Sequence, residues 1–139
     1  MSRHPEELRL LVVEDDGAMA LLILAQLRVL SCSVSLVENS LMAIQAWIAA
    51  REEKRFDAVV MAFKMPARSV LFALGEIRRL EDHLGDSRTP IIALSSDAAA
   101  SAAGNDAHHG FDIVLHKPGD LPRLVPAIRA LTRDPVSMS

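Results

Sequence analysis

The stretch Asp57-Ala58-Val59-Val60-Met61-Ala62-Phe63-Lys64-Met65-Pro66 decides the fold class of this 139-residue chain. Its short apolar run over 57–62 is typical of a strand that is buried on both faces of a sheet. The run leads into a loop at Met65-Pro66. We therefore expect the centre of a parallel sheet here, with Ala62 at the carboxyl end of the strand.

Strand and helix patterns alternate on both sides of this stretch. Further strands are predicted at 8–13, 33–37, 90–94 and 112–115, and helices at 17–30, 39–51, 67–83, 97–108 and 121–133. Asn39 or Ser40 is the predicted N-cap of the second helix, Asp120 that of the last, and Gly85 terminates the third. Five strands alternating with five helices indicate a parallel sheet covered on both faces.

Length and composition fit one soluble domain over 1–139, with a core at about 8–133. The net charge of −3 comes without a basic cluster, so no nucleic-acid partner is expected. The apolar run 18–30 contains Gln26 and Arg28 and is shorter than the roughly 20 residues of a membrane span. No signal peptide pattern is found, and the lone Cys32 fits a reducing compartment. We expect a cytoplasmic protein without membrane contact.

Polar side chains stand where several predicted strands end, which is the edge where open α/β sheets bind ligands. The residues at this edge are Glu14, Asp15, Asp16, Ala62, Ser95, Ser96, His116 and Lys117. Carboxylates suit a hard cation such as Mg²⁺. A hydroxyl and an ammonium suit the oxygens of a phosphoryl group.

The order of these segments resembles the receiver domain of bacterial response regulators. The matching segments are 11–16, 57–66, 90–95 and 117–118. The resemblance implies an α/β, flavodoxin-like fold: a doubly wound, five-stranded parallel sheet of order 2-1-3-4-5 with five helices. It also implies a module of two-component signalling that is not an enzyme, with a histidine kinase or phosphotransfer protein as partner.

The resemblance assigns roles to four residues at the strand ends. Glu14 and Asp15 correspond to the acidic pair that binds Mg²⁺ in receivers. Ser95 corresponds to the hydroxyl residue that senses the phosphoryl group, and Lys117 to the lysine that contacts it. The bond from Lys117 to Pro118 is expected to be cis, which is uncommon for X–Pro bonds.

Three positions depart from the receiver pattern. Ala62 stands where receivers carry the phosphoacceptor aspartate, and Val114 stands where they usually carry a switching aromatic residue. Ala67-Arg68 replaces the Asp-Gly that often follows Met-Pro. Asp57 cannot act as a substitute acceptor, because five strand residues separate it from Ala62 by about 16 Å. We therefore expect no phosphorylation at the usual position.

Plainer readings of the same residues stay open. Ala62 is explained by natural drift to a pseudo-receiver or by an engineered Asp-to-Ala change. Without the acceptor carboxylate, Mg²⁺ affinity should fall, and Glu14 and Asp15 are then a solvated helix cap. Lys117 would form an ion pair with Glu14 or Asp15, and Ser95 would bond to local backbone.

The first predicted helix carries more apolar residues than one buried stripe needs. We predict a partner face at Leu21, Leu24 and Leu27, since receivers dock on kinase or phosphotransfer helices through this helix. Coverage within the monomer and a homodimer are the alternatives. Whether the chain acts alone or within a hybrid kinase stays open.

A second functional hypothesis is a ligand-sensing pseudo-receiver. Its ligand would be a nucleotide second messenger, for example a cyclic dinucleotide, bound through Arg68, Arg78 and Arg79. The plainer reading of these arginines is a solvated helix face.

Overall fold

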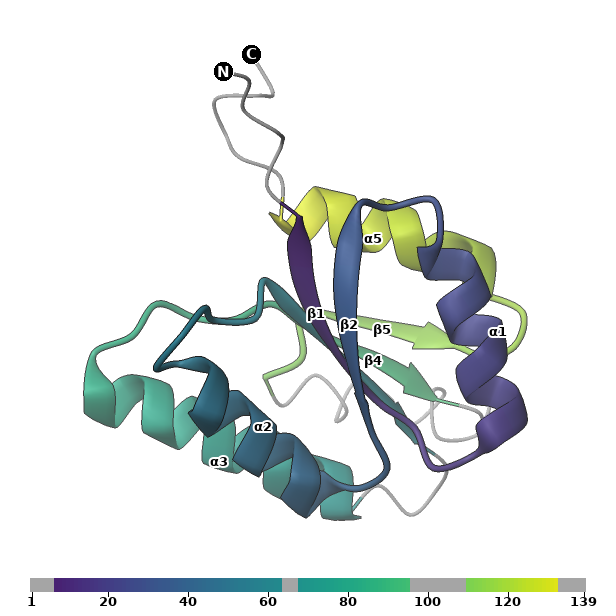
Figure 1. The fold of residues 1–139 in the computed structure, drawn as a ribbon. Coiled ribbons are helices and arrows are strands. Elements are labelled where there is room, and N and C mark those ends of the chain that lie inside the picture. Colours follow the sequence, from purple (N-terminus) through teal and green to yellow (C-terminus); the bar gives the residue numbers. More distant parts are fainter. Residues whose placement is uncertain (1–6, 64–67, 96–109, 133–139) are drawn as a thin grey trace, which may run out of the picture.

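The computed structural model describes residues 7–63, 68–95 and 110–132. Its centre is one five-stranded parallel sheet of order β2-β1-β3-β4-β5 (Figure 1). The strands are β1 (Leu8–Val13), β2 (Cys32–Val37), β3 (Ala58–Phe63), β4 (Ile91–Ser95) and β5 (Ile113–His116). The predicted fold class and strand order are confirmed. Every residue of β3 is buried, as expected for a central parallel strand.

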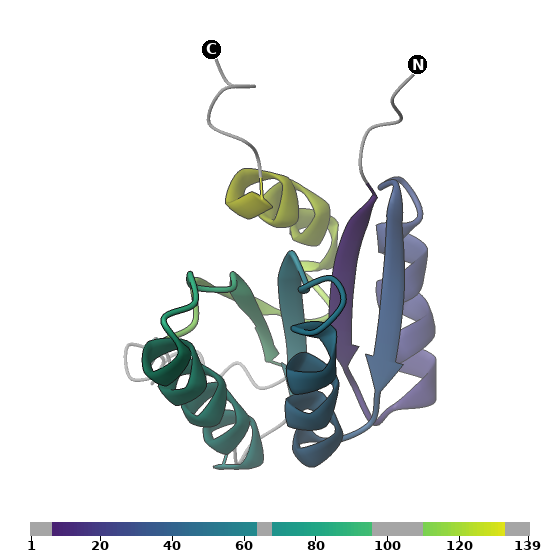
Figure 2. The ribbon, with the colours of Figure 1, turned by 60° about the vertical axis from the view of Figure 1, so that its left-hand side comes forward.

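Helices cover both faces of the sheet. They are α1 (Gly17–Leu27), α2 (Ser40–Ala50), α3 (Arg68–Leu84) and α5 (Leu124–Thr132), with a 3₁₀ turn η2 (Leu121–Arg123) before α5. Helices α1 and α5 lie on one face, and α2 and α3 lie side by side on the other (Figures 1 and 2). Each face has its own apolar cluster, which contains Ile23 and Leu124 on the first and Trp47 and Ile77 on the second. The predicted helix 97–108 lies outside the described residues.

Two of the predicted helix-boundary residues act as expected, and one does not. The side chain of Asn39 caps α2, and Asp16 caps α1 in the same way. Gly85 follows α3 with a positive φ of 72°, which a glycine adopts without steric cost. Asp120 makes no side-chain cap; its carboxylate instead accepts the backbone N–H of His116 at 3.0 Å. The predicted capping role of Asp120 was therefore wrong.

Two predicted helix boundaries also need correction. Helix α1 ends at Leu27 rather than at residue 30, because the N–H groups of Arg28 and Leu30 bond three residues back in a tighter turn. The last helix opens as a 3₁₀ turn with a proline in its first positions and becomes α-helical at Leu124. In the described parts of the chain, no helix combines the length and apolar character of a membrane span.

Candidate functional site

The carboxyl ends of the central strands meet at one edge of the sheet. Phe63, directly after Ala62, pairs with Ser95, and Ser95 pairs with His116 on the next strand. The backbone N–H of Lys117 then donates to the carbonyl of Ser95 at 2.8 Å. The fold therefore brings the predicted residues of β3, β4 and β5 to the same edge.

A buried ion pair joins the end of β1 to the end of β5. The ammonium of Lys117 lies 2.7 Å from Oε1 of Glu14, and each side chain is only 2% exposed. The second carboxylate oxygen, Oε2, accepts the backbone N–H of Asp16 at 3.1 Å. The expected ion pair is thus present, and its acidic partner is Glu14, whereas Asp15 is exposed. The bond from Lys117 to Pro118 is cis, as the receiver resemblance implied.

Ala62 is buried at this edge and brings no reactive group to it. Its side chain is 6% exposed and belongs to the apolar cluster on the α1–α5 face. No residue of β3 carries a carboxylate. The nearest acid before the strand, Asp57, accepts the N–H of Arg9 at 2.7 Å, so it is engaged at the amino end of β3.

Ser95 and Val114 complete the set of predicted site residues. Ser95 is 2% exposed and is the last residue of β4, and its carbonyl accepts the backbone N–H of Lys117. Val114 is half-buried and packs against the apolar cluster on the α2–α3 face. Its short branched side chain is restricted at χ1 and ends at two methyl groups, so it cannot make the large swing of an aromatic ring.

The described acidic groups at this edge do not form a ready-made magnesium site. Both oxygens of Glu14 already have partners, the carboxylate of Asp16 caps α1, and Ala62 supplies no ligand, which leaves the exposed carboxylate of Asp15. In the described ranges, no group of three or more His, Cys, Asp or Glu side chains could hold a metal ion. A hard cation that used Glu14 as a ligand would compete with Lys117 for this carboxylate.

Helix α1 presents only part of its predicted partner face to solvent. Leu21 is 69% and Leu22 is 50% exposed, whereas Leu24 is half-buried. Leu27 is 1% exposed and packs with Ile23 in the core, so its assignment to the partner face was wrong. Residues four apart share a helix face, which is why Leu27 follows Ile23 into the core.

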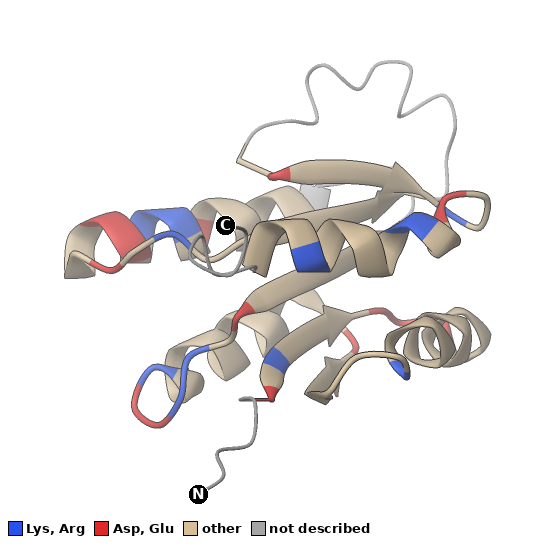
Figure 3. Cartoon of the chain, turned by 90° about the horizontal axis from the view of Figure 1, so that it is seen from above, with Lys and Arg blue, Asp and Glu red and all other residues tan. Residues whose placement is uncertain are grey.

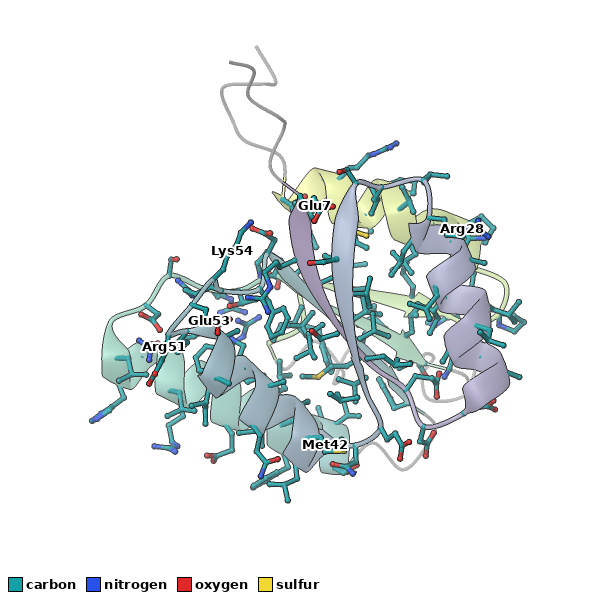
Figure 4. All side chains as sticks on the ribbon, in the orientation of Figure 1. Glu7, Arg28, Met42, Arg51, Glu53 and Lys54 are labelled. Carbon is teal, nitrogen blue, oxygen red and sulfur yellow. The ribbon has the colours of Figure 1, made fainter. Side chains whose placement is uncertain are left out.

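The sequence analysis missed a second apolar surface, on α2. Leu41, Met42 and Ile48 are exposed large apolar side chains of this helix, and Met42 lies at its amino-terminal end (Figure 4). The sequence could have indicated this surface, because residues 40–50 contain no charged residue, and the same is true of α1. Charged residues of the described helices instead gather on α3, whereas α5 carries only Arg129 (Figure 3).

Two of the arginines proposed for ligand binding are held by the protein itself. Arg78 donates to the carbonyls of Thr89 and Gly110 and to the carboxylates of Glu81 and Asp112. Arg79 pairs with Glu76 on the same helix at 2.9 Å. Arg68 is the first residue of α3. Arg78 thus fastens α3 to the start of β4 and β5.

A doubly wound parallel sheet of this strand order, with acidic residues after β1 and a lysine after β5, defines the flavodoxin-like receiver fold. The sequence pattern of the response regulator receiver domain matches residues 10–129. The chain therefore belongs to the response regulator receiver family.

Known relatives come from several kinds of signalling protein. The chain is 34% identical over 128 residues to the response regulator protein PmrA of Pseudomonas aeruginosa, covering 91% of this chain and 53% of PmrA. It is 32% identical over 117 residues to the sensor protein GacS of Pseudomonas syringae pv. syringae, covering 84% of this chain and 12% of GacS. The chain thus spans about half or less of these relatives.

Solved structures show the same fold. The receiver domain of the sensor histidine kinase PA1611 from Pseudomonas aeruginosa, with magnesium in its active site cleft, superimposes with a TM-score of 0.74 at 29% identity and covers 93% of this chain and 100% of that domain. The receiver domain of Ssk1 from Saccharomyces cerevisiae, in complex with the phosphotransfer protein Ypd1, has a TM-score of 0.72 at 22% identity, covering 91% of this chain and 89% of that one.

Proposed function

We propose that this chain is a receiver-type interaction module of two-component signalling that is not phosphorylated on β3. The observation that carries the proposal is the buried Ala62 at the carboxyl end of the strand, where the family pattern places the acceptor aspartate. The Lys117–Glu14 pair supports it, because both groups that would serve a phosphoryl group or a cation already neutralise each other. The module is a pseudo-receiver of the cytoplasm and has no catalytic activity.

The partner in this proposal is a histidine kinase or a phosphotransfer protein that docks on α1. The exposed residues of α1 are Gly17, Ala18, Leu21, Leu22 and Ala25, none of which has a polar side chain. A solvent-facing side of this kind marks an interaction surface. Leu21 and Leu22 are its large apolar side chains, and Leu24 lies half-buried beside them.

The phosphorylation half of the proposal predicts that acetyl phosphate adds no phosphoryl group to the chain. Intact-mass spectrometry in the presence of Mg²⁺ checks this result. The matched variant Ala62→Asp restores a carboxylate at the end of β3. Its intact mass after the same treatment shows whether the rest of the pocket still supports phosphorylation. An acid-labile adduct on the unaltered chain would refute the proposal.

The natural gene distinguishes the two explanations of Ala62. An aspartate codon at position 62 would establish an engineered change, and an alanine codon would establish natural drift.

The docking half predicts that Leu21→Glu weakens binding to phosphotransfer or kinase dimerisation domains at least about tenfold, because a charge would be buried in an apolar contact. Surface plasmon resonance against a panel of such domains measures the change. Ile48→Glu is the matched control, since Ile48 is also an exposed apolar helix residue (44%) but lies on the opposite face of the sheet. Equal losses for both variants would contradict a specific role of α1.

The described arginines do not favour the ligand-sensing alternative. Arg78 has its hydrogen-bonding capacity taken up by Thr89, Gly110, Glu81 and Asp112. A nucleotide phosphate would have to break this network to reach the guanidinium.

A further inference from the structure

A hollow of about 620 Å³ lies between the amino-terminal ends of α2 and α3, next to Ala62. Its base includes the apolar residues Val13, Phe63 and Val70, which are each less than 10% exposed. It is thus a separate surface from the solvent side of α1, which lies on the other face of the sheet (Figures 1 and 2).

Large apolar side chains form the upper walls of this hollow and remain open to solvent. Leu41 from α2 is 62% exposed and Phe72 from α3 is 59% exposed, and both line the hollow. Met42, at the same end of α2, is 41% exposed. An aromatic and an aliphatic wall above an apolar base make a pocket for one large apolar side chain, which is the usual anchor of a protein–protein contact.

The polar part of the lining is acidic. Asp15 and Glu38 line the hollow, and in the described part of the chain neither takes part in an ion pair. The amino-terminal end of α2 contributes about half a positive charge. This offsets only part of the two carboxylate charges, so the described lining favours a cation.

We propose that this hollow docks a segment of another protein in which a large apolar side chain lies next to a lysine or arginine. The apolar side chain would enter between Leu41 and Phe72, and the cation would meet Asp15 and Glu38. Charge complementarity selects such a partner over a second copy of this chain, whose hollow would bring the same two acids. The proposal is independent of docking on α1 and of phosphorylation.

Two tripeptides of opposite charge test the proposal with the same aromatic anchor, acetyl-Lys-Trp-Lys-amide and acetyl-Glu-Trp-Glu-amide. Each is titrated into the ¹⁵N-labelled full chain and followed by amide chemical shifts. We expect the lysine peptide to shift amides of residues 39–42 and 69–72 and to bind at least about threefold more tightly than the glutamate peptide. Asp15→Asn with Glu38→Gln should remove this preference.

Wall variants provide the matched controls. Leu41→Ser and Phe72→Ser should each weaken the lysine peptide at least about fivefold, because they remove apolar contact area. Val29→Ser should leave binding unchanged, since Val29 is also exposed (68%) but follows the end of α1. The strand amides report whether each variant is folded. Equal binding of both peptides, shifts confined to α1, or concentration-dependent shifts at the hollow without peptide, which would indicate a second copy, would each overturn the proposal.

Discussion

Lys117→Met is expected to lower the free energy of unfolding by about 3–5 kcal/mol, the usual cost of breaking a buried ion pair by removing one partner. Methionine keeps most of the length and volume of lysine but removes the charge. The carboxylate of Glu14 then stays 2% exposed without its cation and keeps only the N–H of Asp16. Urea unfolding followed by the fluorescence of Trp47, which lies in the other apolar cluster, measures the loss.

A double variant separates the charge effect from packing. Glu14→Gln added to Lys117→Met removes the orphaned charge, so most of the lost stability should return. Arg123→Met is the surface control, because Arg123 is 72% exposed and lies 3.8 Å from Asp120; its removal should cost little. A loss for Lys117→Met that the double variant fails to recover would mean that packing, not the ion pair, stabilises this edge.

The strands could be predicted almost to the residue, because apolar runs of four to six residues flanked by polar ones leave few alternatives in a parallel sheet. The three strands β3, β4 and β5 each begin and end one residue later than predicted, and they end at Phe63, Ser95 and His116. These residues pair with one another across the sheet, so ladder hydrogen bonds decide the ends. Sequence patterns do not contain that information.

The exposed side of an apolar helix could not be predicted. Helix α1 has apolar residues on all sides, so its sequence does not distinguish the core face of Ile23 and Leu27 from the solvent face of Leu21 and Leu22. Only packing against the sheet decides between them. The Lys117–Glu14 contact was within reach, because the strand order alone brings both strand ends to the same edge.

Helix α3 shows the same limit for charges. Arg78 with Glu81 and Arg79 with Glu76 are both ion pairs of residues three apart on one helix. In sequence the two pairs have the same spacing, with acid and base in opposite order. In the structure the side chains of Arg78 and Glu81 are 14% and 4% exposed, whereas those of Arg79 and Glu76 are 61% and 31% exposed. Breaking the buried pair should therefore lower the free energy of unfolding much more than breaking the exposed pair.

Glu81→Leu is expected to lower the free energy of unfolding by about 3 kcal/mol. The carboxylate of Glu81 accepts the N–H of Thr89 at 2.6 Å and a guanidinium N–H of Arg78 at 2.8 Å. A leucine at this position removes the acceptor of both hydrogen bonds. The loss stays near the lower end of the range for buried pairs, because Arg78 keeps Asp112 and two backbone carbonyls. Thr89 also accepts from the indole of Trp47, so fluorescence reports the change directly.

Glu76→Leu is the matched control on the same helix. Arg79 donates to Glu76 and lowers the pKa of that carboxyl, so any stability from this pair is present at neutral pH and fades as the pH falls through the lowered pKa. Because the pair is open to solvent, removing it at pH 7 should change unfolding little. Similar losses for the two variants would show that burial does not distinguish the pairs. A large loss for Glu81→Leu alone would show that Glu81 holds α3 to the start of β4, the strand that ends at Ser95.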